Sequence, residues 1–317
     1  MATATAARSE TTSTPRLRSP WVSQTIAIVA VLTGFVIAGH RLIPDIHGSG
    51  SLIDTAAPWL VLIVPVLGVG AILTRSRVAG LALIVPLLVW LAVFGSAWLP
   101  RGGGVTQLRV ANQNVDAENP QPAQTVRALE RTGADVIGLE EVTPASAPAI
   151  AATLDGRYPY HVEESTVQLW SRYRISDFTG VDLGLSWTRA LRAQISTPYG
   201  AVTVYVVHLA SARAGQTATR DSTMAALVNR VRSDASKRLV VIGDLNTASS
   251  DRVLGPLTNL LRDTQASAGS GLGFTWPSGF PMARPDHILF RGLTATASTV
   301  VETSGTDHRA ITAGLRF

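Results

Sequence analysis

The segment VVIGDLNT, Val240 to Thr247, places an acid and an amide directly after a short apolar run. The run predicts a buried strand, and Gly243 predicts a sharp turn at its end. Side chains two positions apart in an extended chain point the same way, so Asp244 and Asn246 can face one site. A carboxylate and an amide held in this way can orient a water molecule and hold a hard cation near a phosphate. Taken alone, a strand that ends in Gly-Asp is more often only a turn.

Other strand-like segments end in the same kinds of side chain, and these positions change the interpretation. Each has a structural alternative as a turn former, a helix start, a buried histidine or a turn cap. Together they supply carboxylates and amides for Mg²⁺, a carboxylate that orients water, and imidazoles for a phosphate and a leaving oxygen. In chain order the positions are Asn114, Glu141, His208, Asp244 with Asn246, Asp286, and Asp307 with His308.

Other hydrolytic chemistries lack a comparable setting in this sequence. It contains no cysteine, so a thiolate nucleophile or a thiolate metal site is excluded. It also has no G-x-S-x-G elbow for a serine nucleophile and no His-x-x-x-His pair for zinc. The polar strand ends therefore favour metal-dependent hydrolysis of phosphoesters.

The elements before residue 100 predict a membrane anchor. Residues 1–20 are rich in Ser, Thr and Ala and predict a disordered cytoplasmic tail. Each of three apolar segments then meets the length of about 20 residues that a spanning helix needs. No polar face interrupts them, which argues against buried helices of a soluble protein. The segments are 21–38, 56–74 and 78–99.

Short-loop charges predict the orientation of this anchor. Three Arg precede the first segment, and Arg75 and Arg77 lie between the second and third. The positive-inside rule places these residues in the cytoplasm and the remainder of the chain outside. We therefore predict a three-span cell-membrane anchor over 21–100, a linker over 101–106 and an extracytoplasmic domain over 107–317.

The external domain alternates strand-like and helix-like segments, which predicts an α/β fold with two sheets packed face to face and helices outside. Residues 254–285 are rich in Gly, Ser and Pro and predict surface loops beside the site. Helices are expected at 122–131, 147–154 and 217–233. Strands are expected at 108–111, 135–139, 167–170, 191–195, 202–207, 239–242, 287–290, 294–301 and 310–317.

Charge argues against a nucleic-acid groove. The formal net charge is +5; six Arg against three acids give +3 in the first hundred residues, which leaves +2 for the rest. The high isoelectric point reflects the use of Arg in place of Lys, since Lys237 is the only lysine. No run of basic residues predicts a duplex-binding surface.

The order of these motifs resembles the endonuclease/exonuclease/phosphatase superfamily, the metal-dependent hydrolases related to DNase I and neutral sphingomyelinase. The resemblance covers about Leu108 to Phe317. It implies a four-layered α/β sandwich with the site at one mouth, preceded here by the three transmembrane helices. It also implies Mg²⁺ as the cofactor, with Mn²⁺ as the alternative.

The resemblance assigns some acids and amides to the metal. Asn114 and Glu141 match the metal-binding positions, and Asp307 matches the acid beside the metal. Two residues depart from the family pattern. Glu140 stands where Gln is usual, so it adds a charge that would strengthen or duplicate metal ligation, and Thr306 stands where Ser is usual.

The remaining matches concern the phosphate and the water. Asp244 and Asn246 match the GDxN motif, which orients the attacking water and the phosphate. His208 matches the family histidine that contacts the phosphate. Asp286 matches the carboxylate that orients the imidazole of His308, and such a carboxylate fixes the tautomer and raises the pKa of the histidine.

Two local segments resemble the membrane-bound VanJ-type proteins that are associated with teicoplanin resistance. They are NVDAENPQP, residues 114–122, and LWSRY, residues 169–173. Arg172 in the second segment matches a position near the substrate channel. Arg189 and Arg220 are further candidates to assist the reaction, with a surface salt bridge as the alternative role for two of these three.

The leading interpretation is a Mg²⁺-dependent phosphohydrolase at the outer membrane face. The short RGGG joint, residues 101–104, would keep the site close to the bilayer. That favours a lipid-linked phosphate or pyrophosphate of the cell envelope, with a link to glycopeptide resistance. A surface nuclease is the alternative, and the near-neutral domain predicts no tight binding of duplex DNA. A non-catalytic protein that binds a cell-wall ligand or antibiotic is the second alternative.

Overall fold

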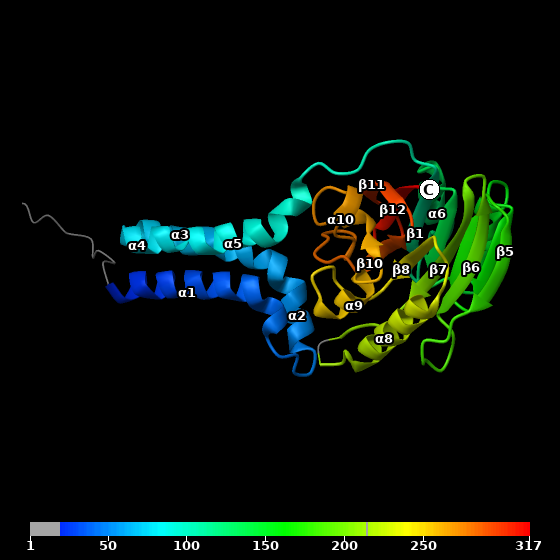
Figure 1. Ribbon diagram of the computed structural model, residues 1–317. Coiled ribbons are helices and arrows are strands. Elements are labelled where there is room, and N and C mark those ends of the chain that lie inside the picture. The colour runs from blue at the N-terminus through cyan, green and yellow to red at the C-terminus, as the bar shows by residue number, and fades with distance from the viewer. Residues whose placement is uncertain (1–19, 214) are drawn as a thin grey trace, which may run out of the picture. The chain divides into compact units, whose positions relative to one another are not determined.

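The computed structural model describes residues 20–213 and 215–317 (Figure 1). The predicted tail lies outside the described residues, apart from Pro20, at which the first helix begins. The chain forms two compact units. One contains the chain up to Ala38 together with Trp59–Val93, and the other contains Gly39–Pro58 together with Phe94–Phe317.

The first unit consists of apolar helices. Three helical stretches are long and apolar enough to cross a membrane: Pro20–Leu42, Ser49–Thr74 and Arg77–Trp98. Their large side chains are mostly exposed, for example Phe35 and Ile72, which suits helices that face lipid. The elements are α1 (Pro20–Gly39), η2 (Ala57–Leu62), α3 (Ile63–Thr74), α4 (Arg77–Ala82) and α5 (Ile84–Phe94), with η3 (Gly95–Trp98) following in the second unit.

The second unit is built on two mixed six-stranded sheets. The first sheet has the order β11 (Thr294–Val301), β12 (Ala310–Arg316), β1 (Leu108–Asn114), β2 (Val136–Glu140), β4 (Val167–Ser171) and β3 (Tyr160–Glu164). The second has the order β5 (Ile175–Gly180), β6 (Ala190–Thr197), β7 (Gly200–His208), β8 (Leu239–Asp244), β10 (Asp286–Arg291) and β9 (Arg262–Asp263).

Apolar side chains pack in three layers between and outside these sheets. The inner faces meet through residues such as Val110, Val204 and Ile242. On the outer face of the first sheet, α6 (Pro122–Arg131) and α7 (Ala147–Leu154) bury Leu129 and Ile150. On the outer face of the second sheet, α8 (Ala218–Ser233) and α9 (Gly255–Thr258) bury residues that include Leu227 and Leu257. The four-layered α/β sandwich is thus confirmed, and burial of each such side chain stabilises it by about 1.5–3 kcal/mol.

Several elements were not expected from the sequence. The strands β3 and β5 lie at sheet edges and carry polar or exposed residues, so their apolar alternation is weak. The expectation of surface loops over 254–285 was partly wrong, because this stretch contains η4 (Arg252–Leu254), α9, β9 and α10 (Thr264–Ala268). It buries Leu254, Leu257 and Leu261, but its helices are too short to show a helical period.

The predicted joint at 101–104 lies against the sheet domain that follows it. The Gly103 N–H donates to the carbonyl of Thr296 at 2.7 Å, and the Arg101 guanidinium donates to the carbonyl of Ala266. A Cβ at Gly102, where φ is +81°, would come within 2.5 Å of the Thr296 carbonyl oxygen. This glycine therefore allows the chain to pass close to β11.

A segment between the first two apolar helices also belongs to the second unit. It comprises η1 (His40–Leu42) and α2 (Ser49–Ala56). The Asp54 carboxylate is fully buried and accepts from Arg252 Nε at 2.7 Å and from the Arg252 backbone N–H at 2.9 Å. His40 Nδ1 lies 2.7 Å from the same carboxylate. Buried charges thus join residues far apart in the sequence.

We expect Arg252→Ala to destabilise the protein by about 3–5 kcal/mol, because it leaves the buried Asp54 carboxylate without its cation. Thermal unfolding in detergent measures this change. Arg157→Ala is the matched control, since the Arg157–Glu130 pair is largely exposed and such pairs contribute about 0–1 kcal/mol. Equal losses in the two variants would show that the Asp54–Arg252 pair does not hold α2 in place.

Candidate active site

Strand pairing brings the predicted site residues to one end of the sandwich. In the parallel pair β7–β8, His208 lies opposite Asp244. In the antiparallel pair β8–β10, Asp286 lies opposite the same Asp244. On the other sheet Asn114 ends β1, and Glu141 follows the last residue of β2. Three acids, an amide and an imidazole therefore meet because of sheet register.

The backbone at this mouth takes conformations that residues other than glycine rarely adopt. Gly243 has φ of +150°, and a Cβ there would lie 1.8 Å from the Val207 carbonyl oxygen, so only glycine fits. Glu141 has φ of +60° and Asn246 has φ of +46°. Such strain costs on the order of 1–3 kcal/mol per residue and is concentrated at functional sites.

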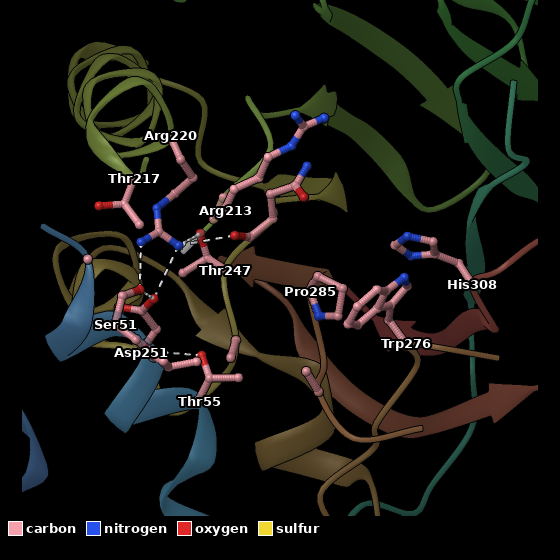
Figure 2. Close-up of a pocket in the computed structure, with 16 residues that line it drawn as sticks. Ser51, Thr55, Arg213, Thr217, Arg220, Thr247, Asp251, Trp276, Pro285 and His308 are labelled. Carbon is pink, nitrogen blue, oxygen red and sulfur yellow. Dashed lines mark hydrogen bonds and ion pairs between the residues drawn. The ribbon is translucent and has the colours of Figure 1, made fainter. Parts of the chain in front are cut away.

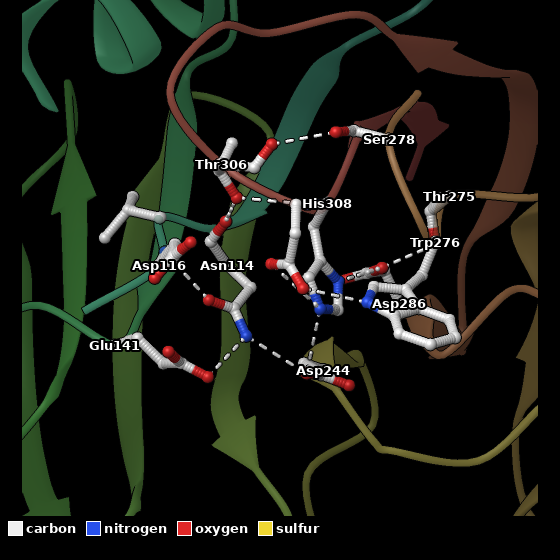
Figure 3. Close-up of polar contacts among 12 residues, drawn as sticks. Asn114, Asp116, Glu141, Asp244, Thr275, Trp276, Ser278, Asp286, Thr306 and His308 are labelled. Carbon is white, nitrogen blue, oxygen red and sulfur yellow. Dashed lines mark hydrogen bonds and ion pairs between the residues drawn. The ribbon is translucent and has the colours of Figure 1, made fainter. Parts of the chain in front are cut away.

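The Asn114 amide connects two carboxylates from different sheets (Figure 3). Its Nδ2 donates to Glu141 Oε1 at 2.9 Å and to Asp244 Oδ2 at 3.1 Å. Its Oδ1 accepts from the Asp116 backbone N–H at 3.0 Å. Glu141 Oε2 also accepts from the Ala117 N–H at 3.2 Å. These bonds hold both acids in place despite their mutual repulsion.

Asp286 and His308 form a buried hydrogen-bonded pair. His308 Nδ1 lies 2.9 Å from Asp286 Oδ2, which also accepts from the Thr275 hydroxyl. His308 Nε2 lies 3.8 Å from Asp244 Oδ2 and 3.8 Å from Asp307 Oδ1. Burial alone lowers the pKa of His308, but the charge and hydrogen bond of Asp286, with the charges of Asp244 and Asp307, raise the pKa to about 10.

His208 has the opposite protonation preference. Burial lowers its pKa to about 4, with the charge of Asp244 opposing the shift and the charges of Arg189 and His308 adding to it. Its Nε2 lies 3.6 Å from Glu141 Oε1 and 3.8 Å from Asp244 Oδ2. The imidazole of His208 is therefore neutral at pH 7, whereas that of His308 is protonated.

The three arginines proposed to assist occupy different places. Arg189 lies at the site, with Nη2 2.7 Å from His208 Nε2. Arg172 pairs with Asp135 at 3.4 Å. Arg220 is buried and donates to Asp251 Oδ2 at 3.1 Å and to the Asn246 carbonyl at 3.0 Å, so it supports the loop after β8.

Glu140 is fully buried in the space between the two sheets. It follows Gly138 on the inner face of β2, and its Oε2 accepts from Asn112 Nδ2 at 3.0 Å. Burial, together with the charges of Asp286 and Asp244, raises its pKa well above the ordinary value. The sequence predicted an added charge for metal ligation at this position, and the raised pKa of Glu140 disfavours that charge.

Other residues of the site carry no strong sequence signal. Trp276 Nε1 donates to Asp307 Oδ2 at 2.9 Å, and Thr275 supports Asp286. Both lie in the stretch expected to be loops. Thr306 Oγ1 donates to the Asn114 carbonyl at 2.8 Å. Asp116 follows Asn114 by two residues, and this spacing could have predicted the contact between its backbone N–H and the Asn114 side chain.

The residues present fit a divalent cation. Asp244, Asp286 and His308 each offer one ligand atom, and these atoms lie within 4.8 Å of one another. Asp286 Oδ1 is buried and has no hydrogen-bond partner among the described residues. Carboxylate oxygens of this kind suit a hard cation. His308 Nδ1 contacts Asp286 and the raised pKa of His308 favours a proton on Nε2, so the carboxylates are the ligands that remain for a cation.

We expect Asp286→Asn to lower the pKa of His308 from about 10 toward its ordinary value near 6.5. The reason is that the variant removes the largest opposing charge and leaves the effect of burial. An NMR titration of labelled histidine in the presence of a chelator measures it. Asp135→Asn, which alters a carboxylate paired with Arg172, should leave the titration of His308 in place.

The same pair predicts how stability depends on pH. A raised histidine pKa adds stability that is fully present below about pH 6.5 and is lost as pH rises through about 10. The wild type should therefore lose more stability than Asp286→Asn between these values. If the free energies of unfolding of the two proteins changed equally with pH across this range, the raised pKa of His308 could not be assigned to its contact with Asp286.

Comparison with known proteins places this geometry in a family. The model of the endonuclease/exonuclease/phosphatase family matches residues 102–308. No curated protein sequence matches the chain. The solved structures that share the fold include the following three, and likeness at their low identity concerns the fold alone.

D. rerio TDP2 complexed with single-strand DNA product is 17% identical, with a TM-score of 0.58 over 66% of this chain and 99% of that one. The mannosyl-6-phosphatase of Bacteroides thetaiotaomicron is 13% identical, with a TM-score of 0.57 over 66% of this chain and 100% of that one. Beta toxin from Staphylococcus aureus is 14% identical, with a TM-score of 0.51 over 65% of this chain and 99% of that one. Because the family model spans well over half of the sequence, the protein belongs to the endonuclease/exonuclease/phosphatase family.

Proposed function

We propose that this protein is a membrane-anchored, metal-dependent hydrolase of phosphoesters or phosphoanhydrides. Its substrate would be a lipid-linked phosphate or pyrophosphate of the cell envelope, reached at the outer face of the membrane. The observation that carries the proposal is one mouth that combines Asn114, Glu141 and Asp244 with the Asp286–His308 pair. The same chain has three helices that could span a membrane.

Asp244 is held as a water-orienting carboxylate should be. Its Oδ1 accepts from the Asn246 backbone N–H at 2.8 Å, and its Oδ2 accepts from Asn114 Nδ2 at 3.1 Å. The Asn246 side chain is fixed in turn, because its Nδ2 donates to the Leu209 carbonyl at 3.0 Å. A carboxylate fixed in this way can accept a hydrogen bond from a water molecule aimed at the phosphorus atom.

The two histidines can contact the phosphate in different protonation states. Protonated His308 can donate its Nε2 proton to a phosphate oxygen or to the leaving oxygen. Neutral His208 can donate a hydrogen bond to a phosphate oxygen without adding charge. A divalent cation held by Asp244, Asp286 and Glu141 would supply Lewis-acid polarisation of the phosphoryl group. We take Mg²⁺ as this cation, with Mn²⁺ as the alternative.

Topology supports the external placement of the site. Residues 39–58 connect the first two apolar helices and belong to the same compact unit as the hydrolase domain. Three crossings put this connection and the chain after the third helix on one side of a membrane. The arginines before the first helix and at positions 75 and 77 favour the cytoplasm for the other side. The VanJ-like segments at 114–122 and 169–173 extend the proposal to glycopeptide resistance.

A nuclease is the second candidate, because one protein of the same fold was solved with a single-strand DNA product. The net charge of +2 after residue 100 offers little attraction for a polyanion. Hydrolysis of DNA in preference to every phospholipid would favour the nuclease.

We expect Glu141→Ala and His308→Ala each to lower hydrolysis of a polyprenyl pyrophosphate by at least about a hundredfold, since each removes a group that acts on the phosphate or its cation. Phosphate release by detergent-solubilised protein measures it for the pyrophosphate and a short-chain phosphate, and chromatography of the products measures hydrolysis of phospholipids and DNA. Glu130→Ala, which removes a carboxylate from the Arg157 ion pair, should retain the wild-type rate. Full activity in both site variants would reject the assigned roles.

Chelation should abolish hydrolysis, because the acids at the mouth would then repel the phosphate without a compensating cation. Added Mg²⁺ or Mn²⁺ should restore the rate, and titration with each ion gives the preference. An undiminished rate after exhaustive treatment with a chelator would contradict metal dependence.

A further inference from the structure

A pocket of about 290 Å³ opens beside the catalytic mouth (Figure 2). At one end it is lined by Asn246 and His308, which belong to the site already described. At the other end it is lined by Ser51, Leu52 and Thr55 of α2. All of these residues lie in the second compact unit. The segment between the first two apolar helices is therefore a wall of the space next to the reacting phosphate.

Buried hydrogen bonds hold this wall in place. Arg220 Nη2 donates to Ser51 Oγ at 2.8 Å, and Arg220 Nη1 donates to Asp251 Oδ2 at 3.1 Å. One turn further along α2, the Asp54 carboxylate is bound by Arg252. Because Ser51, Asp54 and Arg220 are almost fully buried, α2 is fixed to the loop that follows Asn246.

The pocket presents apolar surface to the part of a substrate that adjoins its phosphate group. Leu52 is 60% exposed and Trp276 is 43% exposed, although both are large apolar side chains that line it. Ala248 and Pro285 add further apolar surface. Arg213 contributes a positive charge to the same lining, which suits the anionic end of a substrate.

The covalent connections of α2 indicate where the occupant comes from. The helix begins ten residues after the end of α1, and Ala56 precedes the apolar stretch Trp59–Val93 by three residues. The stretch Ser49–Thr74, which begins with α2, is itself apolar enough to span a membrane. A wall attached in this way on both sides suits a substrate whose carbon chain is anchored in lipid.

We propose that this pocket binds the first carbons of the lipid chain that adjoins the scissile phosphate. The inference rests on the proposed function and adds that α2 selects lipid-linked over soluble phosphates. The chain would contact Leu52 and Trp276, while the phosphate lies at Asn246 and His308. Selectivity then depends on a segment outside the stretch that matches the family, residues 102–308.

The first test compares a long-chain polyprenyl phosphate with a short-chain, water-soluble prenyl phosphate, using the full chain in detergent. For Leu52→Asp we expect the ratio of kcat/KM, long chain over short chain, to fall at least about tenfold, because a charge in the pocket opposes entry of hydrocarbon. Ile46→Asp is the matched control, since Ile46 is an exposed apolar residue of the same segment that does not line the pocket.

An unchanged ratio in Leu52→Asp would overturn the inference while leaving the proposed function in place. A wild type that hydrolyses neither substrate would reject the proposed function, and the inference with it.

A second measurement remains decisive if Leu52→Asp does not fold. A polyprenyl phosphate with a diazirine near its phosphate is photolysed on Glu141→Ala protein, and the labelled peptides are identified by mass spectrometry. We expect label on residues 49–58 and near Trp276, and competition by unlabelled lipid phosphate. Label that is confined to the apolar helices, or that unlabelled lipid phosphate does not displace, would overturn the proposal.

Discussion

Repulsion among carboxylates is the physical constraint that shapes this site. Two unit charges about 4 Å apart interact by about 4 kcal/mol at an effective dielectric constant near 20, and several acids meet at this mouth. Three features of the structure reduce this repulsion. Asn114 donates to Glu141 and Asp244, His308 keeps a proton beside Asp286, and the pKa of Glu140 is raised by burial. A divalent cation would offset the remaining repulsion among the carboxylates. The excess of negative charge that destabilises the protein thus favours the binding of a metal, and the metal in turn would attract a phosphate.

Much of the fold followed from local patterns, because strands such as β7 and β8 are continuous apolar runs and α6 begins at a proline after a polar turn. The convergence of the site residues was also expected, since each lies at or near one end of a strand. Other features depend on contacts that no local pattern encodes. The edge strands β3 and β5 have weak alternation, and Trp276 reaches Asp307 across 31 positions from a stretch without regular period. The internal position of Glu140 follows from the register of β2, which places it beside Asn112.

The segment from residue 39 to residue 58 was the least predictable part. From composition it is a loop between two apolar helices, and no local pattern indicates partners for its acids Asp45 and Asp54. The partners of Asp54 and Ser51 are Arg252 and Arg220, about 170 to 200 positions later. Only the folded chain reveals that these residues compensate one another, and Arg220 acquires a structural role that its place on α8 did not indicate.

This packing makes the segment from residue 39 to residue 58 part of the compact unit that carries the site. The solved structures of the same fold are covered almost completely by 65–66% of this chain, and the family model begins at residue 102. The segment with α2 is therefore an addition to a fold that is otherwise complete. A flexible tether would gain nothing from burying charges such as Asp54, which costs free energy unless the partners are held in good geometry. Their burial next to the loop that carries Asn246 links the position of the inter-helix segment to the geometry of the catalytic mouth. The inter-helix segment and the site thus belong to one structural unit.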